Sequence, residues 1–179
     1  MEGHATEQID HLNAIRSVFT PLLELKALKI LEVDFKCASE VDDEWIAEAS
    51  IGWPFLEILQ LGGDESAPRV TLKGLIPLIR RCTHLGSIQM SMHLKPFNVG
   101  LLKPGDRNMR IRELHVSTCT ISKPIRVFRR LVLMFPQLLM VSAHATSTPG
   151  EEKDWARLES LFNEDVDDDE GGDEDEDEE

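Results

Sequence analysis

The chain has 179 residues, of which 41% are hydrophobic, which is enough for one domain with a packed core. Its net charge of −14 comes from one segment: residues 164–179 contain 13 acidic side chains and no basic one, and the rest of the chain holds 19 basic and 20 acidic side chains. Three widely spaced cysteines and a longest apolar run that Pro136 interrupts argue against a disulfide framework, a zinc site of the CxxC type and a membrane span.

Residues 1–24 form the first predicted element, an amphipathic helical segment that leads into or caps the rest of the domain. Residues 25–148 repeat the pattern L-x-x-L-x-L five times, with apolar residues at the fourth and sixth positions and a polar residue at the fifth. This alternation is typical of a strand with one buried face. The copies are 26 to 29 residues apart, and they begin at Leu28, Leu56, Leu85, Ile111 and Leu138. Such constant spacing predicts five copies of one unit.

We expect a helix after every strand except the third. The first, "VDDEWIAEAS", has Asp42 as its N-cap. The second, "TLKGLIPLIRRC", contains Pro77 and is expected to begin late or to bend. "KPIRVFRRLVLMF" follows the fourth strand, whereas the third connection holds two prolines and two glycines and should be the least regular.

The last two predicted elements are a helix and a tail. Thr148 as N-cap and Glu151 as reciprocal capping acid predict a C-terminal capping helix over residues 149–162. Residues 163–179 cannot bury apolar surface and are predicted to be a disordered acidic tail.

A strand and a helix in 26 to 29 residues predict a leucine-rich-repeat solenoid of the α/β class, with a parallel sheet on the concave side and helices on the convex side. At their repeat positions Trp45 and Trp53 are expected in the core rather than in an interface. In "IRELHVSTCTI", Cys119 takes the place of the residue that hydrogen-bonds the turn after the strand in such repeats.

The polar fifth position is the best candidate for a partner-binding surface. Because side chains alternate across a strand, these residues should form one row on the concave face, where solenoid proteins bind their partners. The same row is also consistent with strand residues that are simply solvated. The candidate residues are Glu32, Gln60, Gln89, His115 and Ser142.

Several blocks of the chain share a further pattern: "DDEWIAEASIGWPFLEILQLGG", "PRVTLKGLIPLIRRCTHLGSIQM", "RELHVSTCTI" and "FPQLLMVSA". They combine an acidic helix that contains tryptophan with a Trp-Pro-x-Leu turn into a strand. This combination, over about residues 12–143, resembles the leucine-rich-repeat region of fungal, basidiomycete-type F-box-like proteins. The resemblance implies substrate recognition for a cullin-type ubiquitin ligase. It implies an adaptor link only if an F-box is encoded upstream of Met1, because the roughly 25 residues before the first predicted strand do not resemble one.

Motifs for catalysis are absent from the sequence: there is no GxSxG, no HExxH and no glycine-rich phosphate loop. His115 and Cys119 are near enough in sequence for a thiol–imidazole pair, but an exposed strand histidine and a turn cysteine explain them more simply. We therefore expect a protein that is not an enzyme and that carries no cofactor or metal.

A basic middle segment raises the question of nucleic acid, because residues 69–130 hold 13 basic and two acidic side chains. Arg80 and Arg130 lie on predicted helices, whereas Arg110 flanks a strand, so we do not expect these arginines to share a face. An aromatic content of 6% offers few surfaces for base stacking. We therefore expect no nucleic-acid binding and, with no signal peptide or apolar span, a protein of the cytoplasm or nucleus that is not secreted.

Two functions remain from the sequence. The first is a non-catalytic module for protein–protein interaction, similar to the substrate-recognition repeats of F-box receptors. The second is an acidic-tailed adaptor or chaperone for basic proteins such as histones, which the 13 acidic residues of 164–179 favour.

Overall fold

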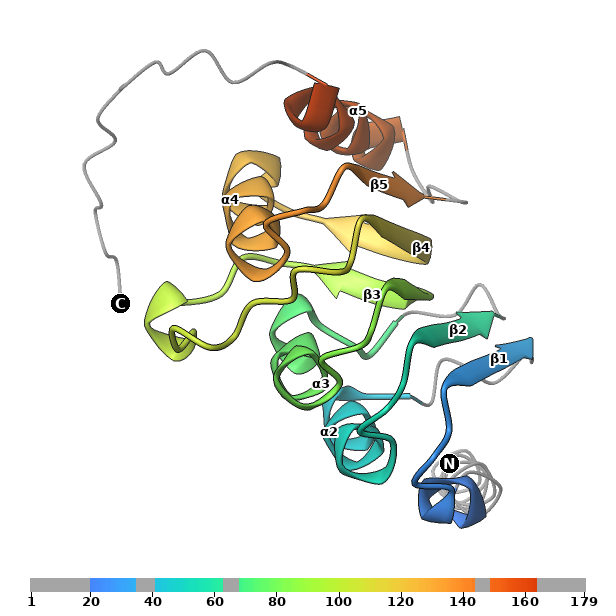
Figure 1. Ribbon diagram of the computed structural model, residues 1–179. Helices are drawn as coiled ribbons and strands as arrows, with labels where there is room; N and C mark the ends of the chain where they lie inside the picture. The colour runs from blue at the N-terminus through green and yellow to red at the C-terminus, as the bar shows by residue number, and fades with distance from the viewer. Residues whose placement is uncertain (1–19, 35–40, 63–67, 144–148, 164–179) are drawn as a thin grey trace, which may run out of the picture.

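The structure, a computed structural model, describes residues 20–34, 41–62, 68–143 and 149–163, and its strands form one parallel sheet. Each strand pairs with the next one in the chain, in the order β1-β2-β3-β4-β5 (Figure 1). The chain is therefore an α/β protein, as the sequence predicts. The strands span Ile30–Asp34 (β1), Ile58–Gly62 (β2), Ser87–Leu94 (β3), Glu113–Ile121 (β4) and Met140–Ala143 (β5).

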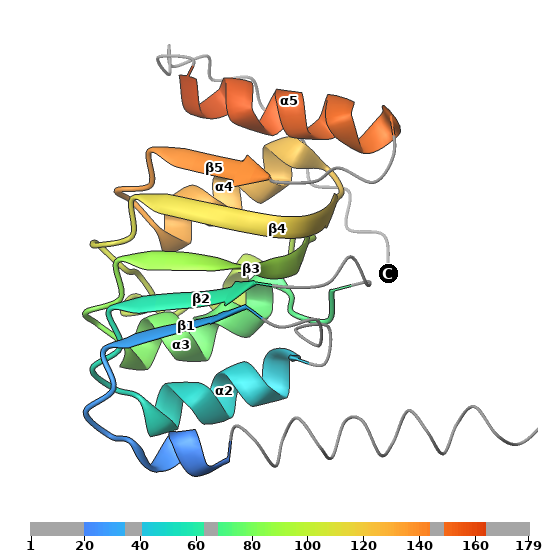
Figure 2. The same cartoon turned by 90° about the vertical axis from the view of Figure 1, so that its right-hand side faces the viewer.

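Helical segments connect the strands and lie on one side of the sheet, while the terminal helix α5 lies beyond β5 (Figures 1 and 2). No described helix covers the other side, which we call the open face. The α-helices are α2 (Asp43–Gly52), α3 (Leu75–Arg81), α4 (Pro124–Met134) and α5 (Pro149–Asn163). The shorter 3-10 turns are η1 (Pro21–Glu24), η3 (Leu72–Gly74) and η4 (Val99–Leu101).

The connections follow the local signals of the sequence. Asp42 caps α2 by accepting a hydrogen bond from the Trp45 N–H at 2.8 Å. Helix α3 begins late, after the turn η3, and Pro77 is its third residue, where an N–H would have no partner within the helix. Between β3 and β4 the described chain forms only the 3-10 turn η4, so this connection is indeed the least regular.

Parts of three predictions fall outside the described residues. Residues 1–19 of the N-terminal lead and residues 164–179 of the acidic tail are among them. So is Thr148, the expected N-cap of α5, although the helix itself spans nearly the predicted range.

The core is built from the apolar positions of the repeated pattern. All five residues at the fourth position are buried: Leu31, Leu59, Ile88, Leu114 and Val141. Trp45 and Trp53 are also buried, as predicted, and their rings meet edge to face with centroids 5.7 Å apart. The Trp53 indole N–H donates to the Leu22 carbonyl at 2.7 Å and so joins η1 to the end of α2.

Strand β4 is longer than the sequence suggests. Its pairing with β3 shifts register between Met90 and Met92 and then continues to Ile121. Cys119, expected at a turn after the strand, therefore lies within it, opposite Met92. The extra residue of a bulge lets both strands resume pairing.

The thiol of Cys82 lies inside the core. The Cys82 side chain donates to the Trp53 carbonyl at 3.2 Å, and burial raises the pKa of this thiol to about 11. Because the thiolate is the reactive form, Cys82 is a structural residue.

Successive units are also joined on the helical side. The Asp43 carboxylate accepts hydrogen bonds from the Thr71 N–H and the Thr71 hydroxyl, each at 2.7 Å. Thr71 in turn accepts from the Gly74 N–H. The first residue of α2 thereby sets the position at which η3 begins.

An ion pair between Arg80 and the buried Asp106 holds the irregular connection between β3 and β4. The Asp106 side chain is only 2% exposed and accepts from Arg80 Nε at 2.6 Å and Nη2 at 2.5 Å. It also accepts from the Lys103 N–H at 2.8 Å. The hydrogen bond from Arg80 lowers the pKa of Asp106 below its ordinary value of 3.8.

Replacing Asp106 with asparagine should lower the free energy of unfolding by about 1–3 kcal/mol at neutral pH, because hydrogen bonds to a charged group are lost. When folding lowers the pKa of a carboxyl group, that group contributes its full stabilisation of the folded state at pH values above its pKa in the unfolded chain. This contribution is lost as the pH falls through its pKa in the folded chain. Urea unfolding should therefore show a constant difference between wild type and Asp106→Asn from about pH 7 to 5, which shrinks below 3.8.

The matched control is Asp34→Asn at an exposed strand end, which should change stability by no more than about 0.5 kcal/mol. A difference that stays constant down to about pH 3 would contradict an ionic role for Asp106.

Candidate functional site

The five polar residues predicted from the repeats lie side by side across the sheet. The ladder pairs Glu32 with Gln60, Gln60 with Gln89, Gln89 with His115, and His115 with Ser142. We call these five residues the polar row. With neighbouring strands about 4.8 Å apart, the row is about 19 Å long.

The polar row lies on the open face, onto which Figure 2 looks. Glu32 is exposed and the other four side chains are half-buried, whereas their strand neighbours such as Leu59 and Leu114 are buried on the helical side. The row is therefore accessible to a partner over its whole length, at least as far as the described residues show.

The most connected part of the row is at β4 and β5. His115 Nδ1 and Ser142 Oγ share a hydrogen bond of 2.7 Å, and His115 Nε2 lies 3.4 Å from a carboxylate oxygen of Glu113. Serine, histidine and an acid serve nucleophilic catalysis when an oxyanion hole accompanies them. Here the Glu113 side chain is 60% exposed, and the group lies on the open face of the sheet.

A second row, which contains both apolar and polar side chains, runs beside the polar row. The register aligns Ile30, Ile58, Ser87, Glu113 and Met140 as the adjacent row. Ile30 is 52% exposed and Met140 is 42% exposed, at opposite ends of the sheet. The two side chains therefore do not form one contiguous apolar patch, but each gives an apolar contact at one end of the polar row.

A hollow of about 280 Å³ lies between β5 and α5. Leu139 and Met140 line it from the strand side, and Phe162 lines it from the helix. Ser142 also borders the hollow, so the polar row leads into an apolar recess at its β5 end.

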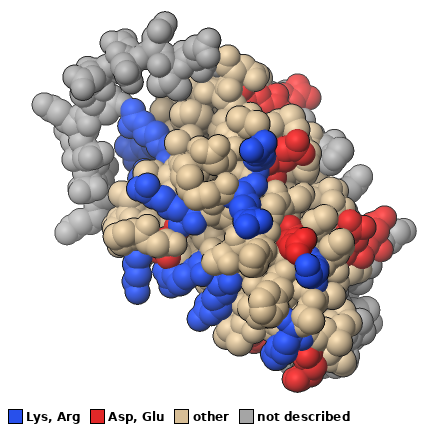
Figure 3. Space-filling model, viewed as in Figure 1, with Lys and Arg blue, Asp and Glu red and all other residues tan. Residues whose placement is uncertain are grey.

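The charged side chains of the described strands on the open face are all acidic: Glu32, Asp34 and Glu113. In Figure 3, lysine and arginine side chains gather mainly on the helical side, and acidic ones are prominent at the strand side. The net charge of the chain does not predict this separation of acidic and basic side chains.

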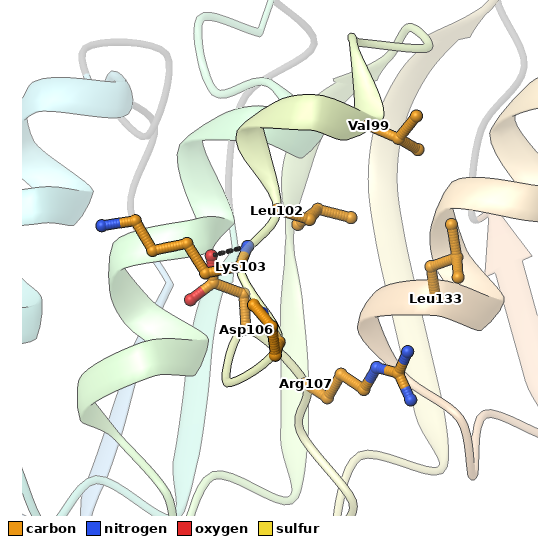
Figure 4. A pocket seen from close by; sticks show the side chains of 7 residues that line it. Val99, Leu102, Lys103, Asp106, Arg107 and Leu133 are labelled. Atoms are coloured by element: carbon orange, nitrogen blue, oxygen red, sulfur yellow. Dashed lines mark hydrogen bonds between the residues drawn. The ribbon is translucent and has the colours of Figure 1, made fainter.

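Two basic hollows on the helical side are not anticipated by the repeats. The first, of about 310 Å³, lies between η4 and α4, and its lining includes Lys103, Arg107 and Leu133 (Figure 4). The second, of about 410 Å³, is lined by Lys73, Arg80 and again Lys103, among others. In this second hollow Arg80 lies with two lysines, and no other arginine lines it.

The sequence does contain a signal for these hollows, namely the 13 basic and two acidic side chains of residues 69–130. The signal is incomplete, because the hollows need the irregular β3–β4 connection to lie beside α3 and α4. No repeat position predicts that placement.

No family model matches this chain, and neither a curated protein nor a solved structure matches it. Within the described ranges, no helix is long and apolar enough to cross a membrane. In the same part of the chain, no group of three or more His, Cys, Asp and Glu residues is placed to hold a metal ion.

The His115–Ser142 hydrogen bond should appear as an energetic coupling. In a double-mutant cycle of His115→Ala and Ser142→Ala, urea unfolding should give a coupling of about 0.5–1.5 kcal/mol. The control cycle joins Glu32→Ala and Gln60→Ala, which are paired in register without a hydrogen bond between their side chains, and its coupling should be below about 0.5 kcal/mol. Equal coupling in the two cycles would mean that the histidine and serine do not interact in solution.

Proposed function

We propose that this chain is a leucine-rich-repeat protein whose open face binds other proteins without catalysing a reaction. The observation that carries the proposal is the polar row, in which one residue from each of five strands lies in register. The repeat spacing of 26 to 29 residues, the sequential strand order and the helices on one side all support a solenoid of this type. In such a solenoid the open face is the concave one.

The chemistry of the open face indicates which partner it fits. Amide, hydroxyl and imidazole groups of the polar row offer both donors and acceptors, and the only charges on the described strands are carboxylates. Ile30 and Met140 provide apolar anchors at the two ends. The partner that suits this surface is an extended protein segment with basic and polar side chains flanked by apolar ones.

The resemblance to F-box-like proteins adds a cellular role to the proposal. In that role the open face holds substrates for a cullin-type ubiquitin ligase. The link to the ligase adaptor would require an F-box encoded upstream of Met1, and reading the genomic sequence there tests this part separately.

Arginine in the middle of the polar row should abolish binding, because it adds bulk and like charge against a basic partner. The variant carries Gln60→Arg, Gln89→Arg and His115→Arg. Its matched control carries Ile51→Arg, Val132→Arg and Gln137→Arg, three exposed positions off the open face that add the same charge. Quantitative pull-down from the source cells should retain the same partners with wild type and control, and should lose them with the row variant. A partner set that is unchanged in the row variant would refute the proposal.

A second function, that of an acidic-tailed adaptor for basic proteins, is favoured by the carboxylates of the open face together with the 13 acids of residues 164–179. A full-length variant with these 13 acids replaced by asparagine and glutamine, which we call the neutral-tail variant, separates the two. If the tail binds basic proteins, this variant should lose polylysine binding at about 0.15 M salt. If polylysine binding is unchanged in the neutral-tail variant, the role as an acidic-tailed adaptor is ruled out, and the role of the open face in protein binding is unaffected.

A further inference from the structure

Six basic side chains on the helical side lie around the β3–β4 connection and on α4, and we call them the basic surface. Lys73, Arg80 and Lys103 line one hollow, and Lys103 and Arg107 line the next (Figure 4). Arg130 on α4 reaches the same region, because its Nε donates to the Phe97 carbonyl just before η4 at 2.9 Å. The surface consists of Lys73, Arg80, Lys103, Arg107, Arg126 and Arg130, where Arg126 is one helical turn from Arg130.

The basic surface has little neutralising charge of its own. Asp106, which is buried beneath it, is bound by Arg80, and Asp43 is hydrogen-bonded to Thr71. Among the described residues, the side chains of Lys73, Lys103 and Arg107 form no ion pair. The basic surface therefore suits an anionic segment that can span both hollows.

The chain itself contains such a segment. Residues 164–179 carry 13 carboxylates and lie outside the described residues. They follow α5, whose Phe162 packs edge to face on Phe128 of α4 with ring centroids 4.8 Å apart. Helix α5 therefore ends beside the helix that carries Arg126 and Arg130.

The length of the tail is sufficient to reach the rest of the basic surface. For a random coil of 16 residues, which is the length of the tail, the root-mean-square extension is about 20–24 Å and the limit is about 55 Å. A tethered segment of this length acts at an effective concentration of about a millimolar. Weak contacts are therefore sufficient for it to occupy the surface.

We propose that residues 164–179 bind the basic surface of their own chain. Bound in this way, the tail competes with other polyanions for the basic surface. The proposal concerns the helical side and does not depend on what the open face binds.

The test uses a fluorescent peptide with the sequence of residues 164–179 as a probe and full-length proteins throughout. The neutral-tail variant should bind the peptide in fluorescence anisotropy at low salt. Wild type should bind it about tenfold more weakly if the peptide dissociation constant is about 0.1 mM, because its own tail competes at about a millimolar. Binding to the neutral-tail variant should weaken steeply as the salt concentration rises.

Two double substitutions in the neutral-tail variant locate the site. Lys103→Glu with Arg107→Glu should weaken peptide binding by at least about tenfold. Arg110→Glu with Arg112→Glu makes the same change in net charge at the edge where the strands begin, and should alter binding by less than about twofold. Circular dichroism of both variants confirms that they are folded.

Four results would overturn the proposal. The first is equal peptide binding by wild type and the neutral-tail variant. The second is an equal loss of binding in the two double variants, which would show that only net charge matters. The third is binding of a 16-nucleotide thymidine strand, but not of the peptide, by the neutral-tail variant, which would assign the surface to nucleic acid.

The fourth result comes from sedimentation, which distinguishes a tail bound to its own chain from a tail bound to a second copy. A mass that rises with concentration only when the tail is acidic would place the tail on a second copy of the chain, which also contradicts the proposal.

Discussion

Parallel pairing of equivalent positions in successive strands is the constraint on which the rest of this structure depends. Because Leu31, Leu59, Ile88, Leu114 and Val141 occupy one line of the ladder, each strand buries the same position against the helices. A slip of one residue in any strand would bring its leucines to the open face and its polar residue into the core. The packing of the core thus determines which residues form the polar row, although none of the row residues belongs to the core.

This constraint also separates charge across the molecule. Basic side chains are excluded from the outward positions of the described strands and are concentrated on α3, α4 and the loop after η4. A molecule with an acidic open face and a basic helical side has an electric dipole moment. The field of this dipole would orient charged partners that approach from solution before they make contact. The two sides can therefore serve two different ligands without competing.

The sequence predicted those parts of the structure that depend on local signals and on repetition. Asp42 was recognisable as a cap, Trp53 as a core residue, and Gln60 as an outward residue between two buried leucines, because each position obeys a period or a capping rule. The polar row resulted from the same spacing, since equal offsets place equivalent residues on adjacent strands.

The remainder could not be predicted because it depends on contacts that no period describes. Arg80 and Asp106 are 26 residues apart and meet only because the β3–β4 connection folds back towards α3. The shift between Met90 and Met92, which extends β4 beyond Cys119, is set by pairing between the two strands and leaves no mark in either one alone. The basic hollows arise from the same irregular connection.

The replacement of a helix by η4 has a consequence for motion. Helix α2 packs on α3, and α4 packs on α5, whereas η4 and its loop stand between α3 and α4 (Figure 4). The helical layer is thus divided into two pairs, and the β3–β4 ladder and the Arg80–Asp106 ion pair are the main links across the seam. Cooperative units separate where the fewest buried contacts join them. The division therefore concerns the helical layer alone, because the β3–β4 ladder, which has the most register pairs of the sheet, joins the two halves and limits how far the helix pairs can move apart.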